Sequence, residues 1–174
     1  LLDCGVKEEK LKPFMHWVDV NVYKPAPRNH KGVNVLFVGR PIPIKGKYIV
    51  EEVERKLFYL KGLTFRYIEN CPHKDLIQHY QWADILVVPS QYSEGFPRVV
   101  FEGAACGCMV IASNKGALSE LVDNFGVTNL WDWGQGIAMF YSQPKTVKAY
   151  QRKSRLYATK FFTPKNAETI LNEY

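Results

Sequence analysis

The sequence predicts an α/β fold: a doubly wound, Rossmann-like domain with a parallel sheet, followed by C-terminal helices. Apolar runs at 33–38, 84–88 and 109–113 have the length and the β-branched content of buried strands. Helical patterns separate these runs, and such βαβ alternation is typical of parallel sheets with right-handed crossovers. A polar loop with a glycine and a proline follows the run at 84–88, at the edge where open α/β sheets bind ligands.

The remaining elements fit this alternation. A helix is expected over about 49–60, because apolar residues recur there at helical spacing and Gly62 suits a left-handed cap. Another helix is expected from about Pro97 to Cys106, since proline suits a first helical turn. The other expected elements are a strand at 63–68, a helix at 73–83, a short helix at 118–122, a strand at 126–130, and helices at 134–143, 146–162 and 164–174.

Composition excludes several classes of protein. The 174 residues suit one domain, and 47% hydrophobic content argues against disorder. No apolar run approaches the ~20 residues that span a bilayer, and no signal segment opens the sequence, so the cytoplasm is the expected compartment. The first residue is Leu1 rather than methionine, so a fragment is expected. The net charge of +6 is compatible with nucleic acid, an anionic membrane or a phosphate-bearing ligand.

Other motifs are absent from the sequence. No Gly-x-Gly-x-x-Gly and no Gly-Lys-Ser/Thr occurs, which argues against a dinucleotide oxidoreductase or a P-loop enzyme. The four cysteines lack metal-ligand spacing, and no metal site or disulfide is expected. The four histidines fall in no catalytic arrangement and are interpreted as structural.

Two carboxylates frame the turn after the run at 84–88. Glu94 lies in the loop and Glu102 follows about one and a half helical turns after Pro97, so both can face the ligand edge. Ionised carboxylates accept hydrogen bonds from paired sugar hydroxyls, and the free N–H groups at a helix start favour phosphate. The alternative is an ordinary acidic helix start stabilised by the dipole.

Two cations occupy the loop after the first strand. Gly39 and Arg40 end that strand, and Lys45 follows before the next helix, with two prolines between them that should stiffen the loop. A guanidinium fork and a compact ammonium both suit pyrophosphate. The alternative is a pair of surface cations in an exposed loop.

The string from Pro89 to Gly107, with Glu94-Gly95-Phe96-Pro97 and Glu102, resembles the donor-binding motif of GT-B glycosyltransferases. It is most similar to the large retaining family, glycosyltransferase family 4 or group 1, known for a Glu-(seven residues)-Glu motif. The resemblance implies that this chain is the C-terminal, donor-binding half of a GT-B fold. Residues 1–32 would then be the tail of an N-terminal domain and a linker, and 33–174 the nucleotide-sugar domain.

The resemblance also implies roles for single residues. Arg40, Lys45 and Glu94 would be the catalytic residues, the two cations acting on the diphosphate and Glu94 beside the donor sugar. Glu102 would hold the ribose hydroxyls. The further donor-binding residues implied are Gly39, Ser93, Gly95, Phe96 and Pro97. Residues 68–71, where the family usually cradles the base, lack its glycine-containing pattern, and Glu120 matches a frequent acidic position without a clear role.

The implied reaction moves a sugar from a nucleotide-diphosphate donor to an acceptor with retention of configuration, and it needs no metal or other cofactor. The acceptor, a sugar, lipid or protein, would bind through the missing domain; nucleic acid is not an expected partner. The basic helix at 146–162 is either a solvated face or a peripheral contact with anionic lipid. The alternatives for the whole chain are a non-catalytic nucleotide-sugar or membrane-surface module and a fragment of a GT-B nucleotide-sugar epimerase.

Overall fold

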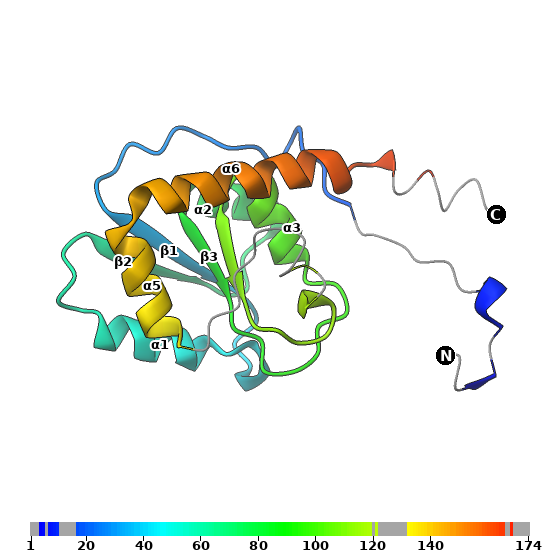
Figure 1. Ribbon diagram of the computed structural model, residues 1–174, viewed down its shortest axis with the longest axis horizontal. Coiled ribbons are helices and arrows are strands. Elements are labelled where there is room, and N and C mark those ends of the chain that lie inside the picture. The colour runs from blue at the N-terminus through cyan, green and yellow to red at the C-terminus, as the bar shows by residue number, and fades with distance from the viewer. Residues whose placement is uncertain are drawn as a thin grey trace.

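The computed structural model describes residues 4–5, 7–10, 17–119, 121, 132–165 and 168. Four parallel strands form one sheet, in the order β2-β1-β3-β4 (Figure 1). The strands are β1 (Val33–Val38), β2 (Leu63–Ile68), β3 (Ile85–Val88) and β4 (Met109–Ala112). The predicted α/β fold with a parallel sheet is therefore confirmed.

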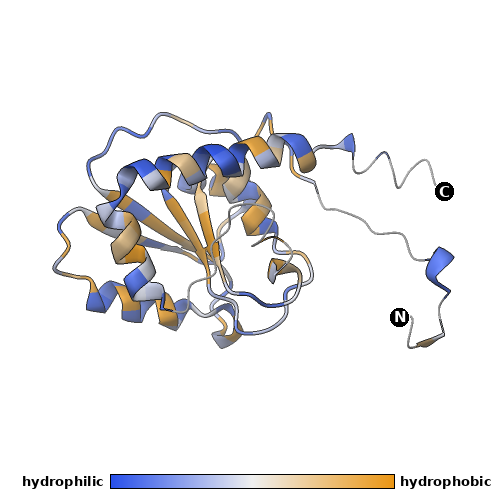
Figure 2. Cartoon of the chain, in the orientation of Figure 1, coloured by the Kyte–Doolittle hydropathy of each residue, from blue (hydrophilic) through white to orange (hydrophobic). Residues whose placement is uncertain are grey.

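Helices cover both faces of the sheet. Helices α1 (Lys47–Lys56) and α5 (Trp133–Ser142) lie on one face, and α2 (Leu76–Trp82) and α3 (Arg98–Ala105) lie on the other. Side chains of β1 alternate between the two layers, with Phe37 in the first and Leu36 in the second. Hydrophobic residues, drawn in orange, accordingly predominate on the strands and alternate with hydrophilic ones along the helices (Figure 2).

The longest helix, α6 (Pro144–Phe161), packs alongside β4 and contributes to both layers. Val147 near its start joins the layer of α1 and α5, and Ala158 near its end joins the layer of α2 and α3. The segment before β1 is also anchored: Val18 and Tyr23 are buried, and the Val18 amide donates to the Phe162 carbonyl at 3.0 Å. The domain boundary at residue 32 stays a prediction.

The strand order places a switch point between β1 and β3. The connection after β1 leads to β2 on one side of the β1/β3 pair, whereas the connection after β3 leads to β4 on the other side. The loops that follow β1 and β3 therefore leave the sheet in opposite directions, and a crevice opens between them at the carboxyl edge.

Several element boundaries differ from the sequence-based predictions. Helix α1 ends at Lys56 rather than near residue 60, because the chain tightens into a turn in which the Leu60 amide donates to the Leu57 carbonyl. Gly62 does adopt a positive φ of 86°, but in the turn before β2. The predicted helix at 73–83 is a 3-10 turn, η4 (His73–Asp75), followed by α2.

Other predictions cannot be compared fully with the structure. Residues 117–119 and 121 are helical, in agreement with the short helix predicted there, whereas Glu120 lies outside the described residues. The strand predicted at 126–130 lies outside them entirely, and so does most of the helix predicted at 164–174.

Candidate functional site

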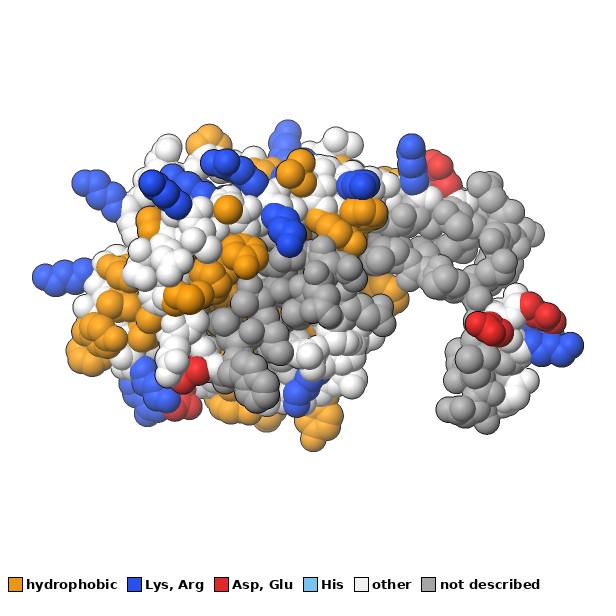
Figure 3. Space-filling model, in the orientation of Figure 1, with side chains coloured by type: hydrophobic (Ala, Val, Ile, Leu, Met, Phe, Trp, Pro, Cys, Tyr) orange, Lys and Arg blue, Asp and Glu red, His pale blue; other side chains and the backbone are white. Residues whose placement is uncertain are grey.

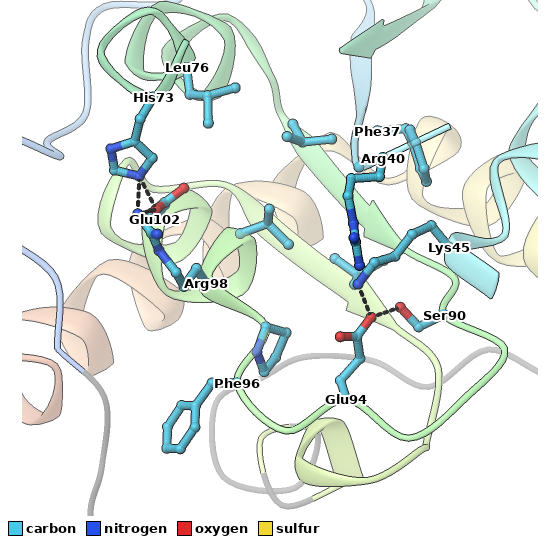
Figure 4. Close-up of a pocket in the computed structure, with 15 residues that line it drawn as sticks. Phe37, Arg40, Lys45, His73, Leu76, Ser90, Glu94, Phe96, Arg98 and Glu102 are labelled. Carbon is cyan, nitrogen blue, oxygen red and sulfur yellow. Dashed lines mark hydrogen bonds and ion pairs between the residues drawn. The ribbon is translucent and has the colours of Figure 1, made fainter. Parts of the chain in front are cut away.

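A cavity of about 390 Å³ opens at the carboxyl ends of β1 and β3 (Figure 4). Seven of the nine predicted site residues line it: Gly39, Arg40, Lys45, Glu94, Phe96, Pro97 and Glu102. Ser93 and Gly95 belong to the same loop but do not line the cavity. The two loops singled out in the sequence thus meet at the topological switch point.

Lys45 and Glu94 are paired directly across the two loops. The Lys45 ammonium donates to Glu94 Oε1 at 2.5 Å, and the Ser90 hydroxyl donates to the same oxygen. Burial raises the pKa of Glu94, but the hydrogen bonds from Lys45 and Ser90 and the charges of Lys45 and Arg40 outweigh it, so the pKa lies below its ordinary value. Glu94 is therefore an ionised acceptor at neutral pH.

The loop after β1 is locked against the loop after β3. Its 3-10 turn, η3 (Pro43–Lys45), ends at Gly46, which has a φ of 72°. A Cβ added to Gly46 would lie 2.1 Å from the Pro89 carbonyl oxygen, so only glycine allows this approach. The Gln91 amide also donates to the Ile44 carbonyl at 2.8 Å. This contact fixes Lys45 beside Glu94.

A second glycine turn supports the backbone of Glu94. The Ala117 amide donates to the Glu94 carbonyl at 2.8 Å, and Gly116 pairs with Glu94 as an isolated parallel bridge. Gly116 has a φ of 60°, and a Cβ there would lie 2.7 Å from the Glu94 backbone. The loop after β4 thereby holds Glu94 at the cavity.

Glu102 forms a second polar cluster across the cavity from Lys45 (Figure 4). This carboxylate is buried, and its Oε2 accepts from the Tyr80 hydroxyl at 2.8 Å. Its Oε1 lies 2.6 Å from His73 Nε2 and accepts from Arg98 at 3.5 Å. Burial, together with the charge and the hydrogen bond of Glu102, raises the pKa of Tyr80, so the phenol remains a donor.

Sequence reasoning missed the partners of Glu102. His73, interpreted as structural, lines the cavity and also lies within 3.1 Å of the Tyr23 hydroxyl. Arg98 lines the cavity as well, half exposed. The signal for His73 was its place in the segment that follows β2, at the same carboxyl edge as the two loops. No pattern in the sequence indicated Tyr80, which reaches Glu102 from α2.

The segment after β2 compensates for its unusual sequence. Asn70 has a φ of 54°, the left-handed conformation that glycine adopts readily and asparagine tolerates. Ahead of it, the Ile68 carbonyl accepts from the Gly39 amide at 3.1 Å, which ties this segment to the loop of Arg40. The missing glycine therefore does not prevent the turn.

Chemically, the cavity combines cations that suit a polyphosphate with a fixed, buried carboxylate that suits paired hydroxyls. Arg40 is exposed, and its guanidinium points toward the Lys45–Glu94 pair (Figure 4). Within the described residues, no group of three His, Cys, Asp or Glu side chains is arranged to hold a metal ion. Nor does any helix in that part of the chain have the length and apolar character to cross a membrane.

The sequence is similar to known glycosyltransferases. Residues 20–157 match the family model of glycosyl transferases group 1. The D-inositol 3-phosphate glycosyltransferase of Rhodococcus jostii (strain RHA1) is 34% identical over 106 residues, which cover 57% of this chain and 23% of the relative. The D-inositol 3-phosphate glycosyltransferase of Nocardia farcinica (strain IFM 10152) is 31% identical over 153 residues, which cover 83% of this chain and 33% of the relative. The chain spans less than half the length of these relatives.

Solved structures share the fold. HepE from Anabaena, solved in complex with UDP and glucose, matches with a TM-score of 0.80 at 17% identity, over 99% of this chain and 58% of that one. The C-terminal domain of the group 1 glycosyl transferase LpcC from Francisella tularensis matches with a TM-score of 0.73 at 19% identity. The match covers 84% of this chain and 98% of that domain. The Rossmann-like fold of a C-terminal GT-B domain and the family match agree, and the chain belongs to the group 1 glycosyl transferases.

Proposed function

We propose that this chain binds the nucleotide-diphosphate sugar donor of a retaining glycosyltransferase, which moves the sugar to an acceptor. The observation that carries the proposal is the meeting of Arg40 and Lys45 with the Glu94 loop at the β1/β3 switch point. HepE, which has the same fold, was solved with UDP and with UDP-glucose, which supports a donor of this class. The resemblance to the retaining Glu-(seven residues)-Glu family supports retention.

In this proposal the diphosphate lies between the loop after β1 and the start of α3. Breaking the bond between the sugar and the diphosphate leaves negative charge on the departing phosphate oxygens. Arg40 and Lys45 stabilise that charge, and the positive end of the α3 dipole, directly after Pro97, adds to their effect. Positive charge supplied by side chains and backbone suffices for this step.

Glu102 binds the ribose in the same proposal. Tyr80 fixes Oε2, whereas Oε1 is shared with His73 and Arg98, whose side chains are 51% and 57% exposed. Ribose hydroxyls replace the contact of His73 with Oε1 when the donor enters, and Glu94 lies beside the sugar. The acceptor binds to a part of the parent protein outside this chain.

Calorimetry with UDP-, GDP- and ADP-sugars tests the proposal. One donor class is expected to bind, and Arg40→Ala and Glu102→Ala are each expected to weaken it about tenfold or more, since each removes a charged hydrogen bond worth roughly 1.5–3 kcal/mol. Lys61→Ala, in the exposed turn before β2, is the matched control and should bind as the wild type does. Equal affinity of all four proteins for a bound donor would refute the site, and no binding of any donor would refute the function.

A further inference from the structure

The positive charge of the chain is concentrated on one helix. Helix α6 contains six Lys and Arg residues and no Asp or Glu. The whole chain has 23 basic and 17 acidic residues, so the sequence outside α6 has 17 of each and is balanced. The formal net charge of +6 is thus the charge of α6.

Most of these cations share one exposed face. We define the α6 surface by its outward side chains, which are Lys145, Lys148, Ala149, Arg152, Lys153, Leu156, Lys160 and Phe161. Arg155 alone turns inward, where it donates to the carbonyls of Val20, Tyr23 and Ala105. In the space-filling view, blue and orange side chains gather along α6 (Figure 3).

The cations of the α6 surface lack acidic partners within the described part of the chain. No carboxylate of that part lies within 4.0 Å of the charged groups of Lys145, Lys148, Arg152 or Lys153. Helix α1 differs, because Lys47 pairs with Glu51 and Lys56 pairs with Glu52. Because no carboxylate neutralises them, these cations can attract an external anion with their full charge.

Apolar groups lie among these cations. The Leu156 side chain is 69% exposed, in the middle of the stripe. It borders a shallow groove of about 440 Å³ that Ala149, Tyr157 and Phe161 line together with Arg152, Lys153 and Lys160. The rings of Tyr157 and Phe161 lie 4.2 Å apart, and the Lys160 ammonium lies over Phe161. Cations interspersed with leucine and aromatic rings are typical of helices that lie on bilayer surfaces.

We propose that the α6 surface docks the protein on an anionic lipid bilayer, with its cations at the headgroup phosphates and Leu156 at the boundary with the acyl chains. Exposed Leu156 favours a bilayer over nucleic acid, because a phosphate backbone offers it no apolar contact. No residue of α6 lines the cavity at the β1/β3 switch point, so docking leaves that cavity open. The inference does not depend on the function proposed above.

Sedimentation with lipid vesicles tests the proposal. The 174-residue chain should sediment with vesicles of equal parts phosphatidylcholine and phosphatidylglycerol, and remain in the supernatant with phosphatidylcholine alone. Because each Lys or Arg near such a surface contributes roughly a factor of five to partitioning, Arg152→Gln/Lys153→Gln should reduce partitioning about 25-fold. Raising the salt concentration should weaken binding, through screening.

Matched variants at the end of α1 and in the turn that follows it are the controls. Arg55→Gln/Lys61→Gln removes the same charge near α1 and should leave partitioning within about twofold of the wild type. Leu156→Ser should reduce partitioning, whereas Phe58→Ser, at a side chain 84% exposed in the turn after α1, should not. The proposal is overturned if the chain does not bind the anionic vesicles, if both charge pairs matter equally, or if Leu156→Ser has no effect. It is also overturned if duplex DNA binds as tightly and competes with the vesicles.

Discussion

The ion pair between Lys45 and Glu94 restrains a cation that the proposed ligand needs. The Lys45 side chain is 24% exposed, and its Nζ lies 2.5 Å from Glu94 Oε1. A diphosphate entering the cavity must therefore share the ammonium with the carboxylate. Glu94 is ionised and therefore also repels the anion. Its presence in a phosphate site is understandable only if it serves another part of the ligand, which in our proposal is the donor sugar.

Removing the charge of Glu94 should separate these two effects. Glu94→Gln is expected to bind UDP several-fold more tightly, because a like charge near the diphosphate is lost and Lys45 is released. The same variant should lose affinity for the UDP-sugar relative to UDP, since the contact with the sugar is weakened. Calorimetry with both ligands measures the two effects, and Glu52→Gln, which breaks the surface pair with Lys56, is the matched control. Weaker UDP binding by Glu94→Gln would contradict our assignment.

The lowered pKa of Glu94 also predicts a pH dependence of stability. A carboxyl whose folded pKa lies below its unfolded pKa stabilises the fold above the unfolded value, and this contribution is lost as the pH falls through the folded value. The difference in the free energy of unfolding between wild type and Glu94→Gln should therefore shrink below about pH 4.5. Solvent screens the pair, so the full difference is on the order of 1 kcal/mol or less. Urea unfolding at a series of pH values measures it, and a constant difference across that series would count against the ion pair.

At the scale of elements, the site depends on the contact between the loops after β1 and β3. Gly46 makes that contact possible, because its backbone is left-handed and leaves no room for a Cβ beside Pro89. Gly62 is also left-handed, with a φ of 86°, but a Cβ there would lie no closer than 3.5 Å to the Gly32 Cα. Substituting either glycine would therefore strain a left-handed backbone. Only at Gly46 would the added Cβ also clash with Pro89.

Alanine at these two positions should have different effects. Gly62→Ala is expected to cost about 1 kcal/mol of unfolding free energy, the usual penalty of a left-handed non-glycine residue, and to leave UDP binding unchanged. Gly46→Ala adds the clash with Pro89, so it should destabilise further and weaken UDP binding by moving Lys45. Urea unfolding and calorimetry on both variants provide the comparison. Equal losses of stability and binding at the two positions would show that the loop contact is unimportant.

The pattern of apolar residues predicted the strands well because parallel strands buried on both faces form continuous apolar runs. Its limit is clear at α1, where Leu57 stays buried at helical spacing although the helix has ended at Lys56. Periodicity reports which side chains face the core, and a turn can satisfy it as a helix does.

Site residues that lie in one continuous segment were predictable from the sequence. Contacts between elements that are distant in the sequence were not. Glu94 and Glu102 follow from the spacing in a single strand–loop–helix segment. The hydrogen bonds that His73 and Tyr80 make to Glu102 depend on the packing of η4 and α2 against α3, which no local pattern encodes. The same is true of Gly116, whose turn supports Glu94 from beyond β4.

For the whole molecule, two charged surfaces occupy different places on the fold. Arg40 and Lys45 lie at the carboxyl edge of the sheet, whereas helix α6, which carries the α6 surface, packs against β4. This separation allows donor binding and membrane docking to be tested independently. A variant of the α6 surface should bind the donor normally, and a variant of Arg40 should bind vesicles normally.

Amide NMR shifts of the chain titrated with UDP measure most directly where a nucleotide diphosphate binds. We expect the largest shifts at Gly39, Arg40, Lys45 and Phe96, with α6 unchanged, because these residues line the cavity that the diphosphate would enter. Saturable shifts centred instead on α6, with the loops after β1 and β3 unaffected, would contradict this placement of the diphosphate.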